Sequence, residues 1–315
     1  MSTSNESSAL PSGFVALVGQ PNVGKSTLMN AVLGVKVAIA TSKPQTTRNR
    51  ILGVQTFPEK GQLCFVDTPG IHDSHRRLNQ ALNRTALQSL EEVDLVCHLV
   101  DAAAIHGWQR RTGRTGLPPE EEFVMHKLQE QKVKAVLVIN KIDLVEDKLK
   151  LLPLIETLVE ANEYIDVVPV SAKTGENLDR LVDLLLDHLP EQGLLFPEEM
   201  LTDQAERFIA AEFVREQVMD QTRKEIPYSV AVEVETFREN EEKDLLEISA
   251  VIHVERDSQK GIVIGNGGKR IKAIGTKARK EMEKFFGKQV FLETFVRVEP
   301  RWSENPRHLN RFGYE

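Results

Sequence analysis

The sequence predicts an α/β domain, built on a mostly parallel sheet with helices on both faces, followed by a smaller α+β domain. Over residues 13–190, short apolar runs alternate with longer segments of helical spacing, which is the pattern of a parallel sheet with crossover helices. A stretch with Pro, Glu and Gly at 191–201 interrupts the alternation and indicates a linker. Beyond it the order changes to helix, two strands, helix and strand. Two domains of different architecture are therefore expected.

Bulk properties restrict the class of protein. A chain of 315 residues can hold two domains of about 150 residues each. The sequence contains no uninterrupted apolar run of about 18 residues, so no membrane span is predicted. Residues 1–12 are small and polar, without the features of a secretion signal, so we expect a disordered lead-in. Cys64 and Cys97 fall in predicted strands and are expected to be core thiols of a cytoplasmic protein, not a disulfide. The net charge of −7 excludes a uniformly basic nucleic-acid binder but not a local basic patch.

The strongest local signal is a glycine-rich loop between the first strand, residues 14–18, and the first helix. It reads Gly19-Gln20-Pro21-Asn22-Val23-Gly24-Lys25-Ser26-Thr27. Its glycines let backbone N–H groups surround a phosphate, to which the following helix presents the positive end of its dipole. Lys25 can reach β- and γ-phosphate oxygens, and Ser26 can offer its hydroxyl to Mg²⁺. The loop predicts a nucleoside triphosphate site, with contacts from Gly19, Asn22, Val23, Gly24, Lys25, Ser26 and Thr27.

A second phosphate motif follows the third predicted strand. Residues 34–50 are polar and lack periodicity, so we expect a mobile loop, after which 51–57 and 62–66 are predicted strands. At the end of the second of these, Asp67 can hold Mg²⁺ through water and Gly70 can present its N–H to a γ-phosphate. The expected contacts are Asp67, Thr68, Pro69 and Gly70.

The next part of the domain continues the alternation with one interruption. Residues 78–90 have helical spacing, and 94–100 form an apolar strand. Residues 102–119 contain several glycines and three arginines, and we interpret them as a solvated insertion loop, with RNA contact as the alternative. A helix is expected again at 120–131.

The sequence Asn140-Lys141-Ile142-Asp143 predicts the base that is bound. It follows the apolar strand 135–139, and a carboxylate at a strand end can accept both N–H groups of guanine, which adenine lacks. An unpaired buried carboxylate is costly, so such a site can reject the wrong base by about 10⁴-fold. After helix 149–160 and strand 165–170, backbone N–H groups of a short Ser-Ala-Lys loop could contact guanine O6, although such a loop can also be purely structural. The expected contacts are Asn140, Lys141, Asp143, Ser171, Ala172 and Lys173.

The second domain contains a glycine loop of another kind. Helical spacing over 203–224 is followed by alternating strands at 229–237 and 246–255, and another strand is predicted at 289–298. Between them an apolar helix is broken by Gly-Asn-Gly-Gly and resumes as a basic helix. That arrangement fits the GxxG loop of KH domains, which clamps about four nucleotides of single-stranded RNA, whereas the loop by itself could be a helix cap. The expected RNA contacts are Gly265, Asn266, Gly267, Gly268, Lys269, Arg270 and Lys272.

The remaining residues interleave basic and aromatic side chains. In this tail, residues 300–315, two interpretations stay open: stacking on RNA bases and packing onto the domain. The organisation we expect is a lead-in at 1–12, a nucleotide-binding domain at 13–190, a linker at 191–201, an RNA-binding domain at 202–299 and the tail.

Together these motifs closely resemble those of the Era family of bacterial GTPases, in which a Ras-like P-loop G domain precedes a type II KH domain. The similar stretches are GQPNVGKST, KPQTTRNRI, VDTPG, NKID, VSAKTGENL and GIVIGNGGKRIK, and the resemblance covers nearly the whole chain. It implies binding and slow hydrolysis of GTP with Mg²⁺, and binding of the 3′ end region of 16S ribosomal RNA in the assembly and maturation of the 30S subunit. It also implies peripheral association with the inner membrane. We expect a monomer.

The resemblance assigns roles to single residues. It implies that Thr46 or Thr47 reaches Mg²⁺ in the GTP state, of which we choose Thr47, and that Asn22 helps to hold a potassium ion near the phosphates. The residues expected at the reaction itself are Lys25, Thr47 and Gly70.

Hydrolysis is expected to be slow because a catalytic side chain is missing. Ile71 stands where Ras-type enzymes carry the glutamine that orients water, and His72 is a conceivable substitute. Our hypothesis is a switch in which GTP and Mg²⁺ order residues 36–50 and 71–78, and the KH domain binds RNA in the state so selected. One alternative is a constitutive RNA-binding protein whose nucleotide domain is only structural. A second alternative is a tRNA-modification GTPase, but the KH loop and the absence of a C-terminal Cys argue against it.

Overall fold

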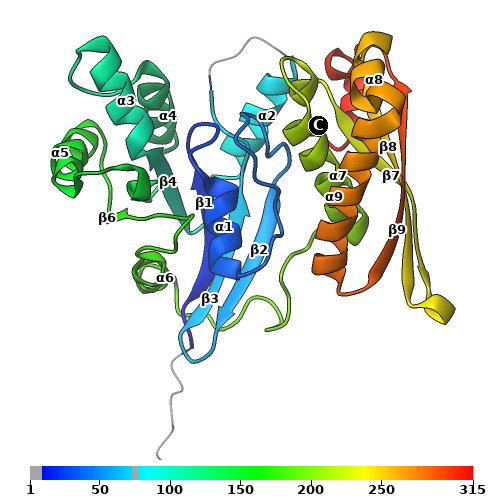
Figure 1. Cartoon of the computed structure of the whole chain (residues 1–315). Helices are drawn as coiled ribbons and strands as arrows, with labels where there is room; N and C mark the ends of the chain where they lie inside the picture. Colours follow the sequence, from blue (N-terminus) through cyan, green and yellow to red (C-terminus); the bar gives the residue numbers. More distant parts are fainter. Residues whose placement is uncertain (1–8, 73–76, 315) are drawn as a thin grey trace, which may run out of the picture.

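The first domain is organised around a six-stranded sheet with strand order β2-β3-β1-β4-β5-β6. The computed structural model describes residues 9–72 and 77–314. All neighbouring strands in this sheet pair in parallel except β2 and β3, so the mostly parallel sheet is confirmed (Figure 1). The strands are β1 (Ser12–Val18), β2 (Ile51–Phe57), β3 (Gly61–Asp67), β4 (Leu95–Asp101), β5 (Ala135–Asn140) and β6 (Asp166–Pro169).

Helices cover both faces of this sheet because successive residues of its buried strands point to opposite sides. On β1, Val15 and Leu17 pack in the core that includes α1 and α6, whereas Ala16 and Val18 pack in the core that includes α4. The helices are α1 (Lys25–Leu33), α2 (Arg77–Gln88), α3 (Ala102–Thr112), α4 (Pro119–Gln131), α5 (Leu151–Ala161) and α6 (Leu178–Asp187).

The segment 102–119 is not the insertion loop that we predicted, because most of it forms α3. The Asp101 carboxylate caps the helix by accepting a hydrogen bond from the Ala104 N–H at 2.9 Å. Ile105 is buried on its inner side, and Gly113 ends it in the left-handed conformation. Only the short stretch 113–118 between α3 and α4 is irregular.

The start of the chain is more ordered than we expected. Ser12 belongs to β1, Pro11 forms an isolated β-bridge with Glu191, and the Gly193 N–H donates to the Leu10 carbonyl. Residues 10–12 are thus tied to the segment predicted as a linker, while residues 1–8 lie outside the described part. Both cysteines are buried and free, as predicted.

The second domain has a three-stranded sheet of order β7-β8-β9. Strands β7 and β8 are antiparallel, and β8 and β9 are parallel. Helices α7 and α9 share one apolar core with the sheet (Figure 1). The elements are α7 (Glu206–Gln221), β7 (Ala231–Asn240), β8 (Leu245–Val254), α8 (Asp257–Ile264), α9 (Lys269–Phe286) and β9 (Gln289–Val298).

The tail packs onto the protein. It contains a 3-10 turn, η6 (Trp302–Glu304), and a short helix, α10 (Pro306–Arg311). Trp302 and Tyr314 are buried in a cluster that also contains Leu78 and Leu82 of α2. Of the two interpretations of the tail, packing is therefore the one that the structure supports. None of the described helices is long and apolar enough to cross a membrane.

Candidate nucleotide and RNA sites

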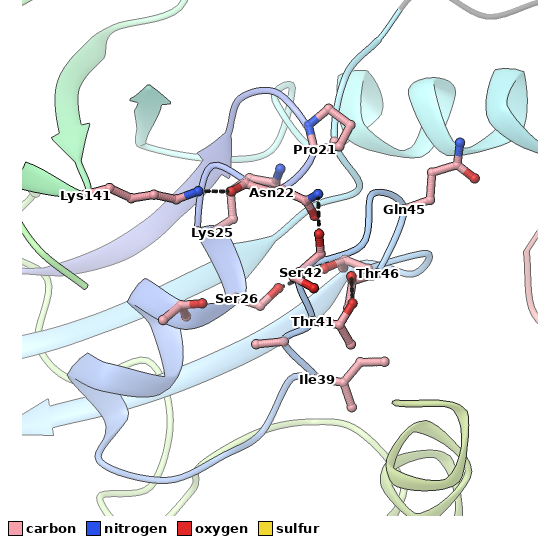
Figure 2. Close-up of a pocket in the computed structure, with 15 residues that line it drawn as sticks. Pro21, Asn22, Lys25, Ser26, Ile39, Thr41, Ser42, Gln45, Thr46 and Lys141 are labelled. Atoms are coloured by element: carbon pink, nitrogen blue, oxygen red, sulfur yellow. Dashed lines mark hydrogen bonds between the residues drawn. The ribbon is translucent and has the colours of Figure 1, made fainter. Parts of the chain in front are cut away.

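A cavity of about 260 Å³ opens at the carboxyl ends of the central strands. Figure 2 shows Asn22 hydrogen-bonded to Lys141 through its backbone carbonyl and to Ser42 through its side chain. The lining residues come from the glycine-rich loop, from residues 39–47 and from two further loops: Pro21, Asn22, Gly24, Lys25, Ser26, Thr27, Ile39, Ala40, Thr41, Ser42, Gln45, Thr46, Thr47, Gly70 and Lys141.

The glycine-rich loop has a shape that only glycine permits at two positions. Gly19 has φ 152° and Gly24 has φ 104°, and a Cβ at either would lie 2.3 Å from a neighbouring atom, the Leu99 carbonyl oxygen or Asn140 Nδ2. These close approaches hold the loop against β4 and against the Asn-Lys-Ile-Asp motif. The loop then passes directly into α1 at Lys25. The predicted strand, loop and helix are thus present, and the helix N-terminus faces the cavity.

Lys25 supplies a buried positive charge beside the loop. Its ammonium group donates to the carbonyl oxygens of Gly19 and Gln20 at 3.2 and 3.0 Å, and the residue is 6 % exposed. Burial lowers the pKa of Lys25 to about 8, although Asp67 and Glu121 act in the opposite direction. A bound phosphate would add negative charge and favour the protonated form, so this site suits an anionic ligand.

Three oxygen-bearing side chains from separate segments converge at the predicted metal site. Ser26 Oγ donates to Asp67 Oδ2 at 2.6 Å, and Thr47 Oγ1 lies 2.8 Å from Ser26 Oγ and 3.2 Å from Asp67 Oδ2. Asp67 is fully buried, burial raises its pKa, and its Oδ1 has no hydrogen-bond partner among the described residues. Hydroxyl and carboxylate oxygens are ligands that Mg²⁺ accepts, so this set fits the ion.

Between the two candidate threonines, only Thr47 reaches this set. Thr46 Oγ1 instead lies 2.9 Å from Thr41 Oγ1 and donates to the Lys43 carbonyl at 2.7 Å. The loop 34–50 that carries both has no regular secondary structure, as expected, but Ile39 is buried in the core of the second domain.

In the motif after β3, one residue lines the cavity and others face the core. Gly70 lines the cavity, and a Cβ there would lie 2.6 Å from the Pro21 backbone nitrogen, so a larger residue would displace the glycine-rich loop. Thr68 turns inward and donates to the Leu17 carbonyl at 2.7 Å. Ile71 is buried in the core beneath β1. His72 has its Nδ1 3.0 Å from the Gly70 carbonyl oxygen and does not line the cavity.

Hydrogen bonds join the two motifs predicted to read the base. Asn140 Nδ2 donates to the Val23 carbonyl at 2.7 Å, and Asn140 Oδ1 accepts from the Ala172 N–H at 3.0 Å. Ser171 Oγ donates to Asp143 Oδ1 at 2.7 Å. The ends of β5 and β6 are thereby fastened to the phosphate-binding loop. The Ala172 N–H, one of the predicted base contacts, thus donates to Asn140 in this structure.

The glycine loop of the second domain projects outward. Asn266 and Gly267 are exposed, and Gly265, Gly267 and Gly268 all have positive φ. A Cβ at Gly265 would lie 2.8 Å from that of Arg270, whose guanidinium donates to the Ile262 carbonyl and closes the loop. The loop separates α8 from α9, as predicted, and leaves its own backbone open to a ligand.

Comparison with known proteins decides the family. A family model described as 50S ribosome-binding GTPase matches residues 14–141, and a KH-domain model matches residues 225–303. The chain is 47 % identical over 304 residues to GTPase Era of Syntrophus aciditrophicus, covering 96 % of this chain and 95 % of the relative. It is 48 % identical over 304 residues to GTPase Era of Geotalea daltonii, covering 96 % and 98 %. The chain belongs to the Era family of GTPases.

Solved Era structures have the same fold. A crystal structure of a variant of Aquifex aeolicus Era bound to GDP·AlF₄⁻ matches with a TM-score of 0.90 and 40 % identity, covering 97 % of this chain and 99 % of that one. Another, of Era in complex with MgGDPNP and nucleotides 1506–1542 of 16S ribosomal RNA, matches with the same TM-score, identity and coverage. The predicted family, and the fold of a G domain followed by a KH domain, are confirmed.

Within this Era-family site, some predicted residues lie off the cavity wall. Pro69, Asp143 and Ser171 do not line it, and Lys173 lines a separate cavity of about 540 Å³ beside α9. Val23 is buried, and its carbonyl oxygen, not its side chain, contacts the base-reading motif.

Sequence reasoning missed Asp101. Its Oδ2 accepts from Lys141 Nζ at 2.6 Å, and Lys141 Nζ also donates to the Asn22 carbonyl at 2.6 Å. Asp101 thus orients the lysine that we expect to lie along the base. Its place at the carboxyl end of β4, beside β5, was the available signal, because ligand-binding residues of such sheets gather at those ends.

Proposed function

We propose that this chain is a switch protein that binds and hydrolyses GTP with Mg²⁺, and that binds the 3′ end region of 16S ribosomal RNA during assembly of the 30S subunit. The observation that carries the proposal is the convergence of Ser26, Thr47 and Asp67, beside a buried lysine, in a chain of the Era family. The RNA assignment is supported by a relative of 40 % identity whose structure contains that part of the RNA.

Each residue of the site has a distinct proposed task. Bound Mg²⁺ would lower the cost of charge on the phosphates. Ser26 and Thr47 would hold the ion directly, Asp67 would hold it through water, and Lys25 would neutralise β- and γ-phosphate charge. Gly70 would present its N–H to the γ-phosphate, which the absence of a side chain next to Pro21 permits.

Slow turnover is part of the proposal. Ile71 points into the core, so the position that carries a glutamine in Ras-type enzymes supplies nothing to the attacking water. Positioning is left to the backbone, to cations and to bound RNA. We also propose that Asn22 helps to hold a potassium ion near the phosphates. The side-chain nitrogen of Asn22, Nδ2, donates to the Ser42 carbonyl at 3.0 Å, and this bond brings the loop of residues 36–50 to the phosphate loop.

The base is assigned to guanine by Asn140, Lys141 and Asp143, with the Ser171, Ala172 and Lys173 loop as support. RNA is assigned to the loop from Gly265 to Gly268 with Lys269, Arg270 and Lys272. The exposed loop backbone and the exposed lysines of α9 support the second assignment.

The domain division is also a proposal. We assign residues 13–190 to the G domain, 202–299 to the KH domain and 191–201 to the linker. The KH-model match over 225–303 lies beyond this linker, and the apolar core that α7 shares with the second sheet supports including α7 in the KH domain. We further propose that the protein is a cytoplasmic monomer that associates peripherally with the inner membrane.

The test compares RNA affinity between nucleotide states. A fragment from the 3′ end of 16S ribosomal RNA should bind the protein more tightly with GDPNP and Mg²⁺ than with GDP, measured by fluorescence anisotropy. Equal affinities would favour the rival interpretation, in which the nucleotide domain is only structural. A scrambled RNA of equal length is the control, since phosphate contacts alone do not read sequence.

A further inference from the structure

The residues on either side of Thr47 are both held by the C-terminal part of the chain. The Thr46 carbonyl accepts a hydrogen bond from Arg215 of α7, 169 positions away in the sequence. The Arg48 side chain inserts between the second domain and the tail. Thr47 itself turns the other way, toward Ser26 and Asp67. The three residues from Thr46 to Arg48 therefore connect the predicted metal site with the RNA-binding half of the protein.

Arg48 is anchored by contacts with the C-terminal part. It is 1 % exposed, and its guanidinium donates to the carbonyl oxygens of Val230 at 2.6 Å and Pro227 at 3.1 Å. The guanidinium carbon lies 5.9 Å from the ring centre of Trp302 and 5.4 Å from that of Tyr314. Burial of a guanidinium is costly, and the two carbonyl oxygens and the ring faces offset part of that cost, although Arg48 Nε has no hydrogen-bond partner among the described residues. Arg48 is therefore a strong anchor.

Arg215 forms the second anchor. It is also 1 % exposed, and its Nε donates to Glu212 Oε1 at 2.6 Å, one turn earlier on α7. The planar guanidinium is fixed by this carboxylate through Nε and Nη2, and Nη2 also donates to the Thr46 carbonyl. Further contacts attach the preceding part of the loop to the same helix: Lys36 Nζ lies 2.6 Å from Glu216, and the Ala40 N–H donates to Glu216 at 3.1 Å.

We propose that Arg48 and Arg215 are positioning residues through which the KH module and the tail hold Thr47 at the magnesium site. The inference rests on the proposed function, in which Thr47 binds the ion only in the triphosphate state. Because coupling between two sites is reciprocal, the C-terminal half that stabilises Thr47 in place is itself stabilised by GTP and Mg²⁺. The two guanidinium groups act through Thr47 and contact neither nucleotide nor metal.

The first test separates the two nucleotide states. Arg215→Met removes the donor to Thr46 and keeps an unbranched side chain on α7. With fluorescent nucleotides and excess Mg²⁺, the dissociation constant for GDPNP should rise about tenfold, the effect of losing a charged hydrogen bond, while that for GDP stays within about twofold. Arg297→Met is the matched control, because it removes a guanidinium that pairs with Glu235 on an exposed strand, and it should change neither constant.

The possible results of this test distinguish the proposals. An equal loss of affinity for GDPNP and GDP, or an unchanged affinity for GDPNP, would overturn the positioning role. Unmodified protein that fails to bind GDP in preference to ADP would overturn the proposed function and this inference together. Since Arg215→Met leaves Glu212 without its partner, the pair Glu212→Gln with Arg215→Met is measured alongside it. Both variants must weaken GDPNP selectively for the proposal to stand.

The second test observes the other end of the connection without any activity measurement. The chain has two tryptophans, so Trp108→Phe on α3 leaves Trp302 as the only one, which can be excited at wavelengths that tyrosine does not absorb. Its ring faces Arg48, so the emission should differ between protein saturated with GDPNP and Mg²⁺ and protein saturated with GDP. Replacing Arg48 by Lys in this background should abolish most of that difference. Identical emission in the two nucleotide states would contradict the coupling.

Discussion

At the end of β5, Asp143 is oriented by the Ser171 hydroxyl, which donates to one of its carboxylate oxygens at 2.7 Å. Asp143→Asn replaces one acceptor oxygen by an NH₂ donor, which conflicts with the N–H groups of guanine and suits the additional carbonyl of xanthine. We expect GTP affinity to fall at least about 100-fold and xanthosine triphosphate affinity to rise, both measured by competition with a fluorescent nucleotide. Unchanged GTP affinity would refute the guanine assignment.

Asp147 offers a matched control for that substitution. Its carboxylate accepts from the Leu149 N–H at 3.1 Å within a turn, a task that Asn performs equally well. Asp147→Asn should therefore leave both nucleotide affinities as they were.

His253 on β8 is a residue whose titration should affect stability. It is fully buried, and burial lowers its pKa, an effect that Glu233, 3.3 Å away, only partly offsets, while Arg311 and Arg297 lower it further. The unfolded chain then binds the proton more readily than the folded chain as pH falls through about 6.5, so folding free energy is lost below that pH. The melting temperature should decline less between pH 7 and 5.5 in His253→Gln than in unmodified protein. The exposed His126, changed to Gln, is the control, and an equal decline in both variants would contradict the prediction.

Among the secondary-structure elements, α3 begins at a residue with two tasks. Asp101 caps this helix through one carboxylate oxygen and pairs with Lys141 through the other. Asp101→Ala should lower the free energy of unfolding by about 1 kcal/mol, measured with urea, and should weaken nucleotide binding as well. Asp101→Asn keeps a capping oxygen but loses the charge, so it should retain most of the stability while still weakening nucleotide binding. A loss of stability without any effect on the nucleotide would show that Lys141 does not depend on Asp101.

The basic face of α9 makes a quantitative prediction for RNA. If about four phosphates are neutralised, log affinity should fall with log salt at a slope near −3. Lys269 and Lys272 are both exposed, so replacing both by Ala should make the slope shallower by about 1.4. Lys243→Ala, in the exposed turn between β7 and β8, should leave the slope unchanged. A flat salt response of the unmodified protein would remove α9 from the interface.

Across the whole molecule, what could be predicted from sequence was local. The glycine loops, the strand-end motifs and the order of elements depend on neighbours in the chain, and so they were recognisable. The prediction of an insertion loop at 102–119 was wrong. Gly107 and a run of arginines weakened the helical pattern, and the residue that caps the helix, Asp101, belongs to the preceding strand. The contacts of Arg48 with Val230 and of Arg215 with Thr46 gave no signal at all, because they join residues more than 160 positions apart and burial of an arginine depends on the tertiary fold.

The buried position of Tyr314 affects how this protein should be handled in the laboratory. That ring is 6 % exposed and sits against Arg48, one residue before the last one in the sequence. A bulky group attached next to Tyr314 would lie beside Arg48, the anchor of the loop that carries Thr47, and would compete for space with the contacts that hold that loop. Purification handles and fluorescent labels are therefore better placed away from Tyr314 and the cluster that surrounds it.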